Sequence, residues 1–293
     1  MDGILVIDKP EGLTSHDVVN SVRRIAGTKK VGHAGTLDPF ATGVLIVGVN
    51  QGTKALTFLK EDDKEYEATL MLGAETDTLD RDGRIVKETP CPDISHDDME
   101  RILASFIGKQ EQLPPRFAAI KKDGIPFYKL ARKGLDFEVP PRGIEIFGIT
   151  LLNVYMPRVS FSVKCSSGTY VRSLARDIGS KIGCGGYLES LRRLKSGRFG
   201  IEKAIPLEKL KGMRNRWHEA AIWLRDALPL PDITVEPEKA EMIRMGKELT
   251  VDEVLSGGLV PEGRFMLTCN KSLVAVAEAG EERRLHLLRV FNP

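Results

Sequence analysis

The chain has 293 residues, 42% of them hydrophobic and 29% charged, with a net charge of +2, which describes an ordinary globular protein with room for one large and one small domain. It contains no 18-residue apolar stretch, so we expect neither export nor a membrane span. Its four cysteines are widely spaced without a CxxC pair, which predicts neither a zinc site nor a disulfide framework and fits a reducing cytoplasm.

The N-terminal part of the chain predicts an αβ layer that ends in a buried strand. Residues 3–8 are predicted to form a strand, and residues 15–26 a helix that Ser15 caps and Gly27 ends. The glycines that follow match neither a dinucleotide-binding fingerprint nor a phosphate-binding loop, so no nucleotide cofactor is expected. Residues 44–49 are nearly all apolar and predict a strand buried on both faces.

The loop before this strand carries His33 and Asp38. Three glycines and Pro39 bracket these two residues, so the backbone can take angles that ordinary residues avoid and present both side chains from one short segment. An aspartate held in this way can act as a nucleophile. Alternatively, Asp38 hydrogen-bonds its own loop as an Asx turn before Pro39. The loop by itself leaves both interpretations open.

Residues 64–72 alternate between apolar and polar side chains and predict a strand whose buried face begins at Tyr66. Taken alone, Tyr66 would be a tyrosine at the edge of the core with a hydroxyl that reaches solvent. The next stretch resembles a calcium-binding loop, but Thr78 and Thr89 fall at its first and last ligand positions, so we predict no calcium site. A helix capped by Ser95 is predicted to run to residue 107.

Residues 110–142 are framed by two proline pairs and interleave basic residues with Phe117, Phe127, Tyr128 and Phe137. Cations with exposed aromatic rings suit single-stranded or looped RNA, because the rings stack on bases and the cations hold phosphates. The alternative is a hairpin whose aromatic side chains form its own small core.

The following segment predicts two long strands, at 144–155 and 159–165, and then a helix at 169–182 with Arg172 in its first turn. A cation at that position opposes the helix dipole by some ~0.3–1 kcal/mol, so Arg172 does not serve helix stability. It is predicted to pair with an anion, either a carboxylate or a phosphate. A structural salt bridge is the alternative.

The last third of the chain predicts a helix at 183–195, a short strand at 196–201 and a helix that ends near residue 226. Residues 192–216 contain nine basic and two acidic residues, which makes them a candidate phosphate-binding surface or merely a solvated helix face. Prolines at 229–237 mark a domain boundary, and the residues that follow are predicted to form a small β-rich module.

Four strings occur in order and at compatible spacing, after the opening ILVIDKPEGLTSHDVV: GTLDPFATGVL, KEYEATLMLGAETDT, LPPRFAAIKKDGIPFYKLAR and CSSGTYVRSLARDIG. On these strings the chain resembles the bacterial tRNA pseudouridine synthases of the TruB family over about residues 3–207. The tail resembles, more weakly, the PUA modules that bind RNA. The resemblance implies isomerisation of the uridine at position 55, in the T-stem loop of tRNA, from an N–C to a C–C glycoside. This chemistry involves no redox, phosphoryl-transfer or hydrolytic step, so neither a metal nor a cofactor is implied.

The resemblance also implies three catalytic residues. Asp38 matches the family's catalytic aspartate, which is proposed to attack the ribose or the base and form a covalent adduct. Arg172 matches the arginine that pairs with this carboxylate and keeps it ionised and oriented. Tyr66 matches the tyrosine that stacks on the flipped uracil and takes part in proton transfer.

Four further residues are implied for substrate binding. Tyr170 and Leu191 match residues that line the pocket. His33 matches a histidine that fills the space left when the uridine leaves its stack, which offsets part of the few kcal/mol that flipping costs. Lys9 matches a lysine of the first motif, and we expect it to support the structure near the site.

We expect an α+β fold: a mixed, mostly antiparallel sheet with flanking helices and a central catalytic cleft, plus a small C-terminal β-barrel-like PUA module. Residues 1–230 would be the catalytic domain, with an RNA-gripping insertion at about 110–142, and residues 231–293 the RNA-binding module. The expected partner is tRNA, with no DNA or membrane, and a monomer is the default. One alternative is a non-catalytic tRNA-binding or folding protein, which would not need Asp38, Tyr66 and Arg172. Another is a synthase within a guide-RNA complex, against which the insertion and the opening motif argue.

Overall fold

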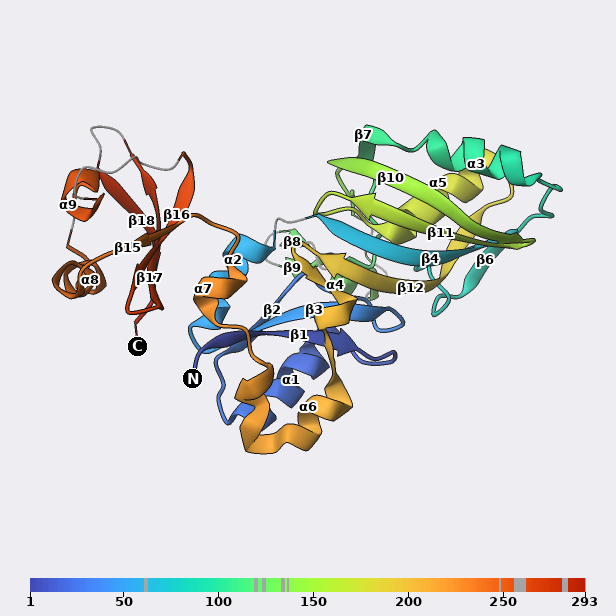
Figure 1. Cartoon of the computed structure of the whole chain (residues 1–293). Coiled ribbons are helices and arrows are strands. Elements are labelled where there is room, and N and C mark those ends of the chain that lie inside the picture. Colours follow the sequence, from blue (N-terminus) through green and yellow to red (C-terminus); the bar gives the residue numbers. More distant parts are fainter. Residues whose placement is uncertain are drawn as a thin grey trace.

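The computed structural model describes residues 1–60, 63–118, 121–122, 125–132, 135, 137–247, 249–255, 262–280 and 284–292. They form a large mixed sheet with helices on its faces and a smaller C-terminal sheet with helices of its own (Figure 1). This arrangement confirms the expected α+β class. No helix in the described ranges is long and apolar enough to cross a membrane.

The large sheet has ten strands. Across the sheet, their order is β14 (Ile205–Pro206), β1 (Gly3–Lys9), β3 (Thr42–Val49), β12 (Gly186–Ser196), β4 (Lys64–Leu72), β11 (Arg158–Cys165), β10 (Arg142–Tyr155) and β7 (Gly108–Gln112), with β2 (Val31–Ala34) paired to β3 and β13 (Phe199–Gly200) paired to β12. The pairs β1–β14 and β3–β12 are parallel, and the other neighbours are antiparallel. The prediction of a mixed, mostly antiparallel sheet is therefore confirmed.

Helices cover both halves of this sheet. They are α1 (Ser15–Ala26), α2 (Gly52–Leu59), α3 (His96–Ala104), α5 (Val171–Ile182) and α6 (Leu207–Met213). One face of β1 and β3 packs on α1 and α6, and the opposite face packs on α2. Strand β3 is thus buried on both faces, as predicted. The other half of the sheet packs on α3 and α5, which lie together on one of its faces (Figure 1).

Helix α1 starts with a capping box formed by Thr14 and Asp17. The Thr14 hydroxyl accepts a hydrogen bond from the Asp17 N–H at 3.1 Å, and the Asp17 carboxylate accepts one from the Thr14 N–H at 2.9 Å. The cap is therefore one residue earlier than the predicted Ser15, whose hydroxyl turns to the loop that carries Asp38. The predicted cap of α3, Ser95, is confirmed.

Residues 186–196 form strand β12, so the helix predicted at 183–195 is wrong. The sequence GYLESLRRLKS is rich in good helix formers, which is why a helix was expected. In the fold, β12 hydrogen-bonds to β4 along one edge and to β3 at Arg192 and Arg193 along the other. Register irregularities after Leu188 and after Arg193 interrupt the period of two that would have indicated a strand. Pairing on both edges outweighs local propensity.

The same strand removes part of the basic surface predicted over 192–216. Arg192 pairs with Asp8, with 2.9 Å between Nη2 and Oδ2. The Lys195 Nζ lies 3.6 Å from the Glu65 Oε1 of β4. The Arg193 residue is only 1% exposed. Arg193 is therefore withdrawn from any phosphate-binding surface, whereas Arg192 and Lys195, with side chains 39% and 45% exposed, lie on a central strand and not on a solvated helix.

Short elements fill the remaining connections: β5 (Ala74–Thr76), β6 (Ile85–Glu88), β8 (Lys121–Lys122), β9 (Ile125–Pro126), α4 (Phe127–Arg132), η1 (Ile201–Lys203), η2 (Arg214–Ala220) and α7 (Leu224–Ala227). The helix predicted to end near residue 226 is divided into η2 and α7, because Ile222 between them bridges to Ile4 of β1. All four cysteines are free thiols, and the Sγ atoms of Cys91 and Cys184 lie 3.3 Å apart.

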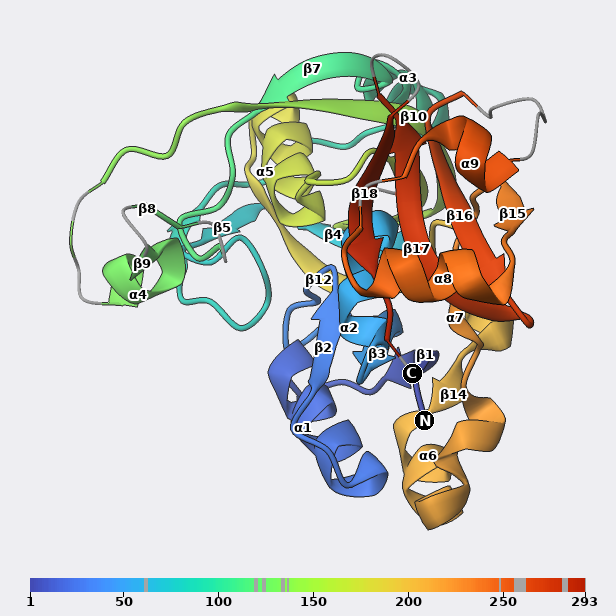
Figure 2. The same cartoon turned by 90° about the vertical axis from the view of Figure 1, so that its left-hand side faces the viewer.

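The segment at 110–142 projects from the body of the protein with α4, β8 and β9 at its tip (Figure 2). Phe127 is buried, its ring centroid lies 4.9 Å from that of Phe137, and the Arg116 guanidinium lies 5.0 Å from the Phe137 ring. These two rings form a small local core, as the alternative interpretation predicted. The side chain of Tyr128 lies outside the described residues, as do residues 119–120, 123–124, 133–134 and 136. The RNA-gripping role of this segment stays a prediction.

The C-terminal module contains β15 (Asp232–Thr234), α8 (Pro237–Arg244), α9 (Val251–Leu255), β16 (Arg264–Cys269), β17 (Ser272–Ala279) and β18 (Leu285–Val290). Within its described ranges, the strands form an open sheet in the order β15-β16-β17-β18 and no closed barrel. The module has its own apolar core and also packs on the cluster that contains α2. Lys54 of α2 donates a hydrogen bond to the Val290 carbonyl at 2.9 Å, and the shared apolar cluster also includes Ile4 and Val6 of β1. The module therefore lies beside the N-terminal strand, and the two ends of the chain lie close together (Figures 1 and 2).

Candidate active site

A cleft of about 730 Å³ opens where β12 and β4 meet the loop after β2 and the N-terminal end of α5. Six of the seven residues predicted for the site line it: His33, Asp38, Tyr66, Tyr170, Arg172 and Leu191. They come from separate segments of the chain, so the fold alone brings them together. The seventh residue, Lys9, lies behind the loop and does not line the cleft.

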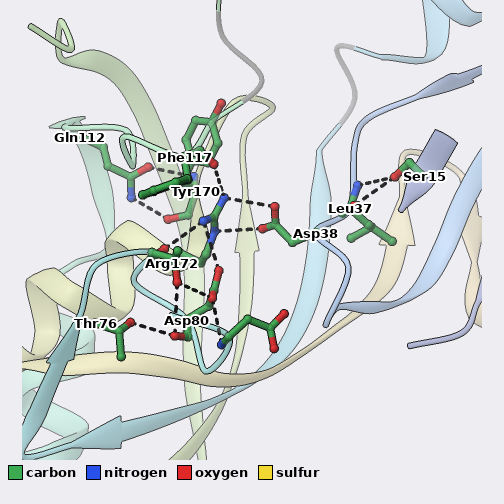
Figure 3. A network of polar contacts seen from close by, with 11 residues as sticks. Ser15, Leu37, Asp38, Thr76, Asp80, Gln112, Phe117, Tyr170 and Arg172 are labelled. Atoms are coloured by element: carbon green, nitrogen blue, oxygen red, sulfur yellow. Dashed lines mark hydrogen bonds and ion pairs between the residues drawn. The ribbon is translucent and has the colours of Figure 1, made fainter. Parts of the chain in front are cut away.

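The loop that carries Asp38 is held through its backbone. The Ser15 hydroxyl accepts a hydrogen bond from the Leu37 N–H at 2.9 Å and donates one to the Leu37 carbonyl at 3.1 Å (Figure 3). The buried Lys9 ammonium donates to the Pro39 carbonyl at 3.2 Å and to two carbonyls of the turn after β1, at 2.9 and 2.6 Å. These contacts fix the backbone on both sides of Asp38 and leave its side chain to other partners.

Arg172 is the partner of the Asp38 carboxylate. Its Nη2 donates to Oδ1 at 3.1 Å and its Nε lies 2.9 Å from Oδ2, so the guanidinium contacts both oxygens (Figure 3). Among the described residues, no backbone N–H bonds to this carboxylate, so the Asx-turn alternative does not describe the loop. The prediction that Arg172 pairs with an anion is confirmed.

A second carboxylate, Asp80, contacts the same guanidinium. Its Oδ2 lies 3.2 Å from Nη1 of Arg172, and Nη1 also donates to the Thr78 carbonyl at 2.9 Å, while Nη2 donates to the Phe117 carbonyl at 3.0 Å. Burial raises the pKa of Asp80, although the Thr78 hydroxyl and the Arg172 charge oppose the rise. The two carboxylates differ in solvent exposure: the Asp38 side chain is 31% exposed and that of Asp80 only 7%. Only Asp38 can therefore meet a substrate in the cleft.

Tyr66 and Arg193 lie opposite each other on β4 and β12. Tyr66 is 8% exposed and lines the cleft, so the expected reach of its hydroxyl into open solvent is wrong. Burial raises the pKa of the Tyr66 phenol, whereas the nearby charge of Arg193 opposes the rise. Burial and the same guanidinium lower the pKa of His33, which lies on β2 and not in a loop, so its ring is neutral at pH 7.

Tyr170 is placed by a pair of hydrogen bonds with Gln112 of β7. The Tyr170 N–H donates to the Gln112 Oε1 at 2.8 Å, and the Gln112 Nε2 donates to the Tyr170 carbonyl at 3.1 Å (Figure 3). Tyr170 is the N-cap residue of α5, so this pair also fixes the first turn, where Arg172 lies. Leu191 of β12 is 7% exposed and supplies an apolar part of the lining.

This geometry is suited to covalent catalysis at carbon. An accessible carboxylate is oriented at both oxygens by a buried arginine, beside a buried phenol and an aromatic side chain at the rim. In the described ranges, the one cluster of three potential metal ligands, His96, Asp97 and Glu100, is exposed on α3 and does not line the cleft.

Comparison with known proteins gives two family matches. Residues 23–171 match the model described as TruB family pseudouridylate synthase (N terminal domain). The chain belongs to the TruB family. Residues 172–231 match the model described as tRNA pseudouridylate synthase B C-terminal domain, so Asp38 and Tyr66 fall in the first TruB match and Arg172 in the second.

Individual relatives agree with the TruB assignment. The chain is 45% identical over 304 residues to tRNA pseudouridine synthase B of Geobacter sulfurreducens, with 100% of both chains covered. It is 52% identical over 304 residues to tRNA pseudouridine synthase B of Geotalea uraniireducens, covering 100% of this chain and 98% of the relative. Among solved structures, it resembles one in a Cbf5-Nop10-Gar1 complex with a TM-score of 0.76 and 26% identity, over 99% of this chain and 85% of that one.

The structure adds two residues to this TruB-family site that the sequence did not indicate: Asp80, which contacts Arg172 outside the cleft lining, and Arg193, which lines the cleft. Asp80 lies in the acidic stretch that was tested only as a calcium loop, and Leu188 of β12 holds that loop through hydrogen bonds of 3.0 Å to Leu79 and Arg81. Arg193 was assigned to a basic helix face. Because both residues act through partners that are distant in sequence, no local pattern would have indicated them.

Lys9 makes the stability of this TruB-family chain depend on pH. Burial lowers the pKa of Lys9 from 10.5 to about 8. The folded chain therefore releases this proton near pH 8, whereas the unfolded chain keeps it to about 10.5. Since the unfolded state binds more protons between these values, the contribution of Lys9 to the free energy of unfolding should rise with pH. Urea unfolding at pH 7.5 and 9.5 should show wild type gaining stability relative to Lys9→Met; an unchanged difference would contradict the prediction.

Proposed function

We propose that this chain isomerises the uridine at position 55, in the T-stem loop of tRNA, to pseudouridine. As a member of the TruB family with relatives named tRNA pseudouridine synthase B at 39–52% identity, the chain is a tRNA uridine isomerase. The observation that carries the assignment of chemistry is the Asp38–Arg172 pair: an accessible carboxylate held at both oxygens at the edge of the cleft. The position of the target uridine comes from the family resemblance.

In the proposed mechanism, the target uridine is flipped into the cleft, and His33 fills the space that it leaves. Asp38 attacks the ribose or the base and forms a covalent adduct, and the N1–C1′ bond breaks. The base then rotates between Tyr66 and the apolar lining, and C5 bonds to C1′ as the Asp38 carboxylate is released. Finally C5 loses its proton and N1 gains one. The atoms of substrate and product are the same, so the reaction needs no oxidant, hydrolytic water or cofactor.

The alternative of a non-catalytic tRNA-binding or folding protein is not supported, because relatives over the full length are named as synthases. Simple binding would also not require a buried arginine shared by two carboxylates. A synthase that works inside a guide-RNA complex is the related alternative, and the insertion and opening motif favour a stand-alone enzyme. We further propose that the insertion and the C-terminal PUA-like module bind tRNA and that the enzyme is a monomer.

Tritium release tests this function. A tRNA transcript labelled at C5 of uridine is incubated with the purified protein in the presence of a chelator, and release is compared for transcripts with uridine or cytidine at position 55. We expect release from the first transcript to exceed that from the second by one equivalent per tRNA. Release that is equal for both transcripts would place the target elsewhere, and tRNA binding without any release would favour the folding protein.

Two cations at the rim of the cleft provide a test of RNA contact. Lys60 and Arg142 are exposed and line the cleft, so we expect them to neutralise phosphates beside the flipped nucleotide. Replacing either by Gln should weaken tRNA binding and reduce the slope of log K against log salt by about 0.7–0.9. Lys181→Gln, at the far end of α5, is the matched control and should leave the slope unchanged. Equal slopes in all variants would mean that the RNA does not pass this rim.

A further inference from the structure

Arg193 is a buried cation without an acidic partner. It is 1% exposed, and none of the ion pairs among the described residues includes it. Its Nε donates to the Val44 carbonyl at 2.6 Å and its Nη2 to the Gly35 carbonyl at 3.0 Å. Burying a charge that is not neutralised is costly, and structures keep such groups mainly where their charge has a use.

The backbone around Arg193 is built to place this side chain. Gly43 pairs with Arg193 across β3 and β12 at φ +100°, and a Cβ there would lie 2.2 Å from the Arg193 carbonyl oxygen, so only glycine fits. Gly35 has φ +77°, and a Cβ there would lie 3.4 Å from Nη1. Gly35 belongs to the loop that carries Asp38, and Gly43 lies at the start of β3, directly after this loop. The guanidinium therefore joins this loop to the central strand of the sheet.

The free side of the guanidinium faces the cleft. Arg193 lines the cleft together with Tyr66 and His33, and it lies directly opposite Tyr66 on the neighbouring strand, so the two side chains share one face of the sheet. We propose that Arg193 is a positioning residue for the isomerisation, which fixes the Tyr66 hydroxyl over the base and supplies the positive charge that lets this hydroxyl exchange a proton with C5. The inference rests on the proposed function, because it assigns Arg193 to the step that follows formation of the new glycosidic bond.

The chemistry of that step explains why a cation is useful there. After C5 has bonded to C1′, the C5–H electron pair must return to the ring to restore the C5–C6 double bond, while N1 takes up a proton. The proton from C5 passes to the Tyr66 oxygen, which must be ionised or able to ionise in the same step. Because the phenol is buried, the ionised form needs a nearby positive charge, and Arg193 provides it without competing for the Asp38 carboxylate.

A double-mutant cycle with Tyr66→Phe tests the inference. Single-turnover rates of tritium release are measured for wild type, Arg193→Gln, Tyr66→Phe and the double variant, with tRNA affinity measured alongside. If Arg193 acts through Tyr66, Arg193→Gln should slow wild type by at least about tenfold but slow Tyr66→Phe by less than about threefold. The pH at which the Arg193→Gln rate rises should also be higher than that of wild type, which a merely structural role would not produce.

Two further variants keep the test decisive. Arg192→Gln changes the neighbouring cation, whose side chain pairs with Asp8 outside the cleft, and it should leave the rate and its pH dependence within about threefold of wild type. If Arg193→Gln does not fold, the cycle is run with Arg193→Lys, which keeps the charge and loses the planar fork. Additive effects in the cycle would overturn the inference alone, whereas an unimpaired Tyr66→Phe enzyme or an inactive wild type would overturn the proposed function.

Discussion

Asp38→Asn should abolish turnover while leaving tRNA affinity within about tenfold of wild type. Asparagine keeps the shape of the side chain and can still accept a hydrogen bond from Arg172, but its amide cannot form the covalent adduct. We expect single-turnover tritium release to fall by at least about a thousandfold, as for other enzymes that lose a nucleophile. Filter binding of labelled tRNA, measured under the same conditions, separates the chemical defect from a binding defect.

Asp80→Asn is the matched control, since it makes the same change on the other side of Arg172. The Asp80 side chain is 7% exposed and cannot reach a substrate, so this variant should be slower than wild type but clearly faster than Asp38→Asn. Loss of tight tRNA binding together with activity in Asp38→Asn would instead show that Asp38 mainly shapes its loop. Equal residual rates in the two variants would show that Asp38 acts only through the orientation of Arg172.

Arg172→Gln should eliminate activity and also destabilise the fold. The guanidinium contacts two carboxylates and two backbone carbonyls, so its removal leaves Asp80 as a buried charge without a counter-ion and Asp38 without orientation. Breaking a buried pair in this way costs about 3–5 kcal/mol. Urea unfolding followed by circular dichroism should show this loss, and tritium release should fall at least as far as in Asp38→Asn.

A second substitution separates the two effects of Arg172. In Arg172→Gln combined with Asp80→Asn, the uncompensated buried charge is gone, so much of the lost stability should return while turnover stays absent. Arg172→Lys keeps the charge but cannot bridge four acceptors, and it should be more stable than Arg172→Gln and nearly as inactive. Recovery of turnover together with stability in the double variant would mean that Arg172 is a structural residue only.

Patterns with a clear local period were predictable from the sequence. Strand β4 has the predicted bounds, Lys64–Leu72, because one of its faces is buried and the other is not, which imposes a period of two. The apolar run of β3 was predicted as a strand buried on both faces, and the capping signal at Ser95 located the start of α3. Three of the four family strings also carry predicted site residues that line the cleft: Asp38, Tyr66, Tyr170 and Arg172, whereas His33 and Leu191 lie outside the strings.

Only the tertiary structure decided that residues 186–196 form a strand, that Asp80 and Arg193 belong to the site, and that Lys9 lies behind the loop. A segment of helix-forming residues becomes a strand when sheet edges on both sides offer hydrogen bonds, and those edges belong to β3 and β4. The ion-pair network joins Arg172 to Asp38, 134 residues away in the sequence, and to Asp80, 92 residues away. No local signal encodes such contacts. Burial then determined the chemistry: it left Asp38 accessible, covered Asp80 and placed the Arg193 charge beside Tyr66. Local sequence determined the strands that alternate between buried and exposed side chains and the strands that are apolar throughout. Tertiary packing decided which charged side chains of the site are buried and which are paired, because desolvation and pairing depend on neighbours from the whole chain.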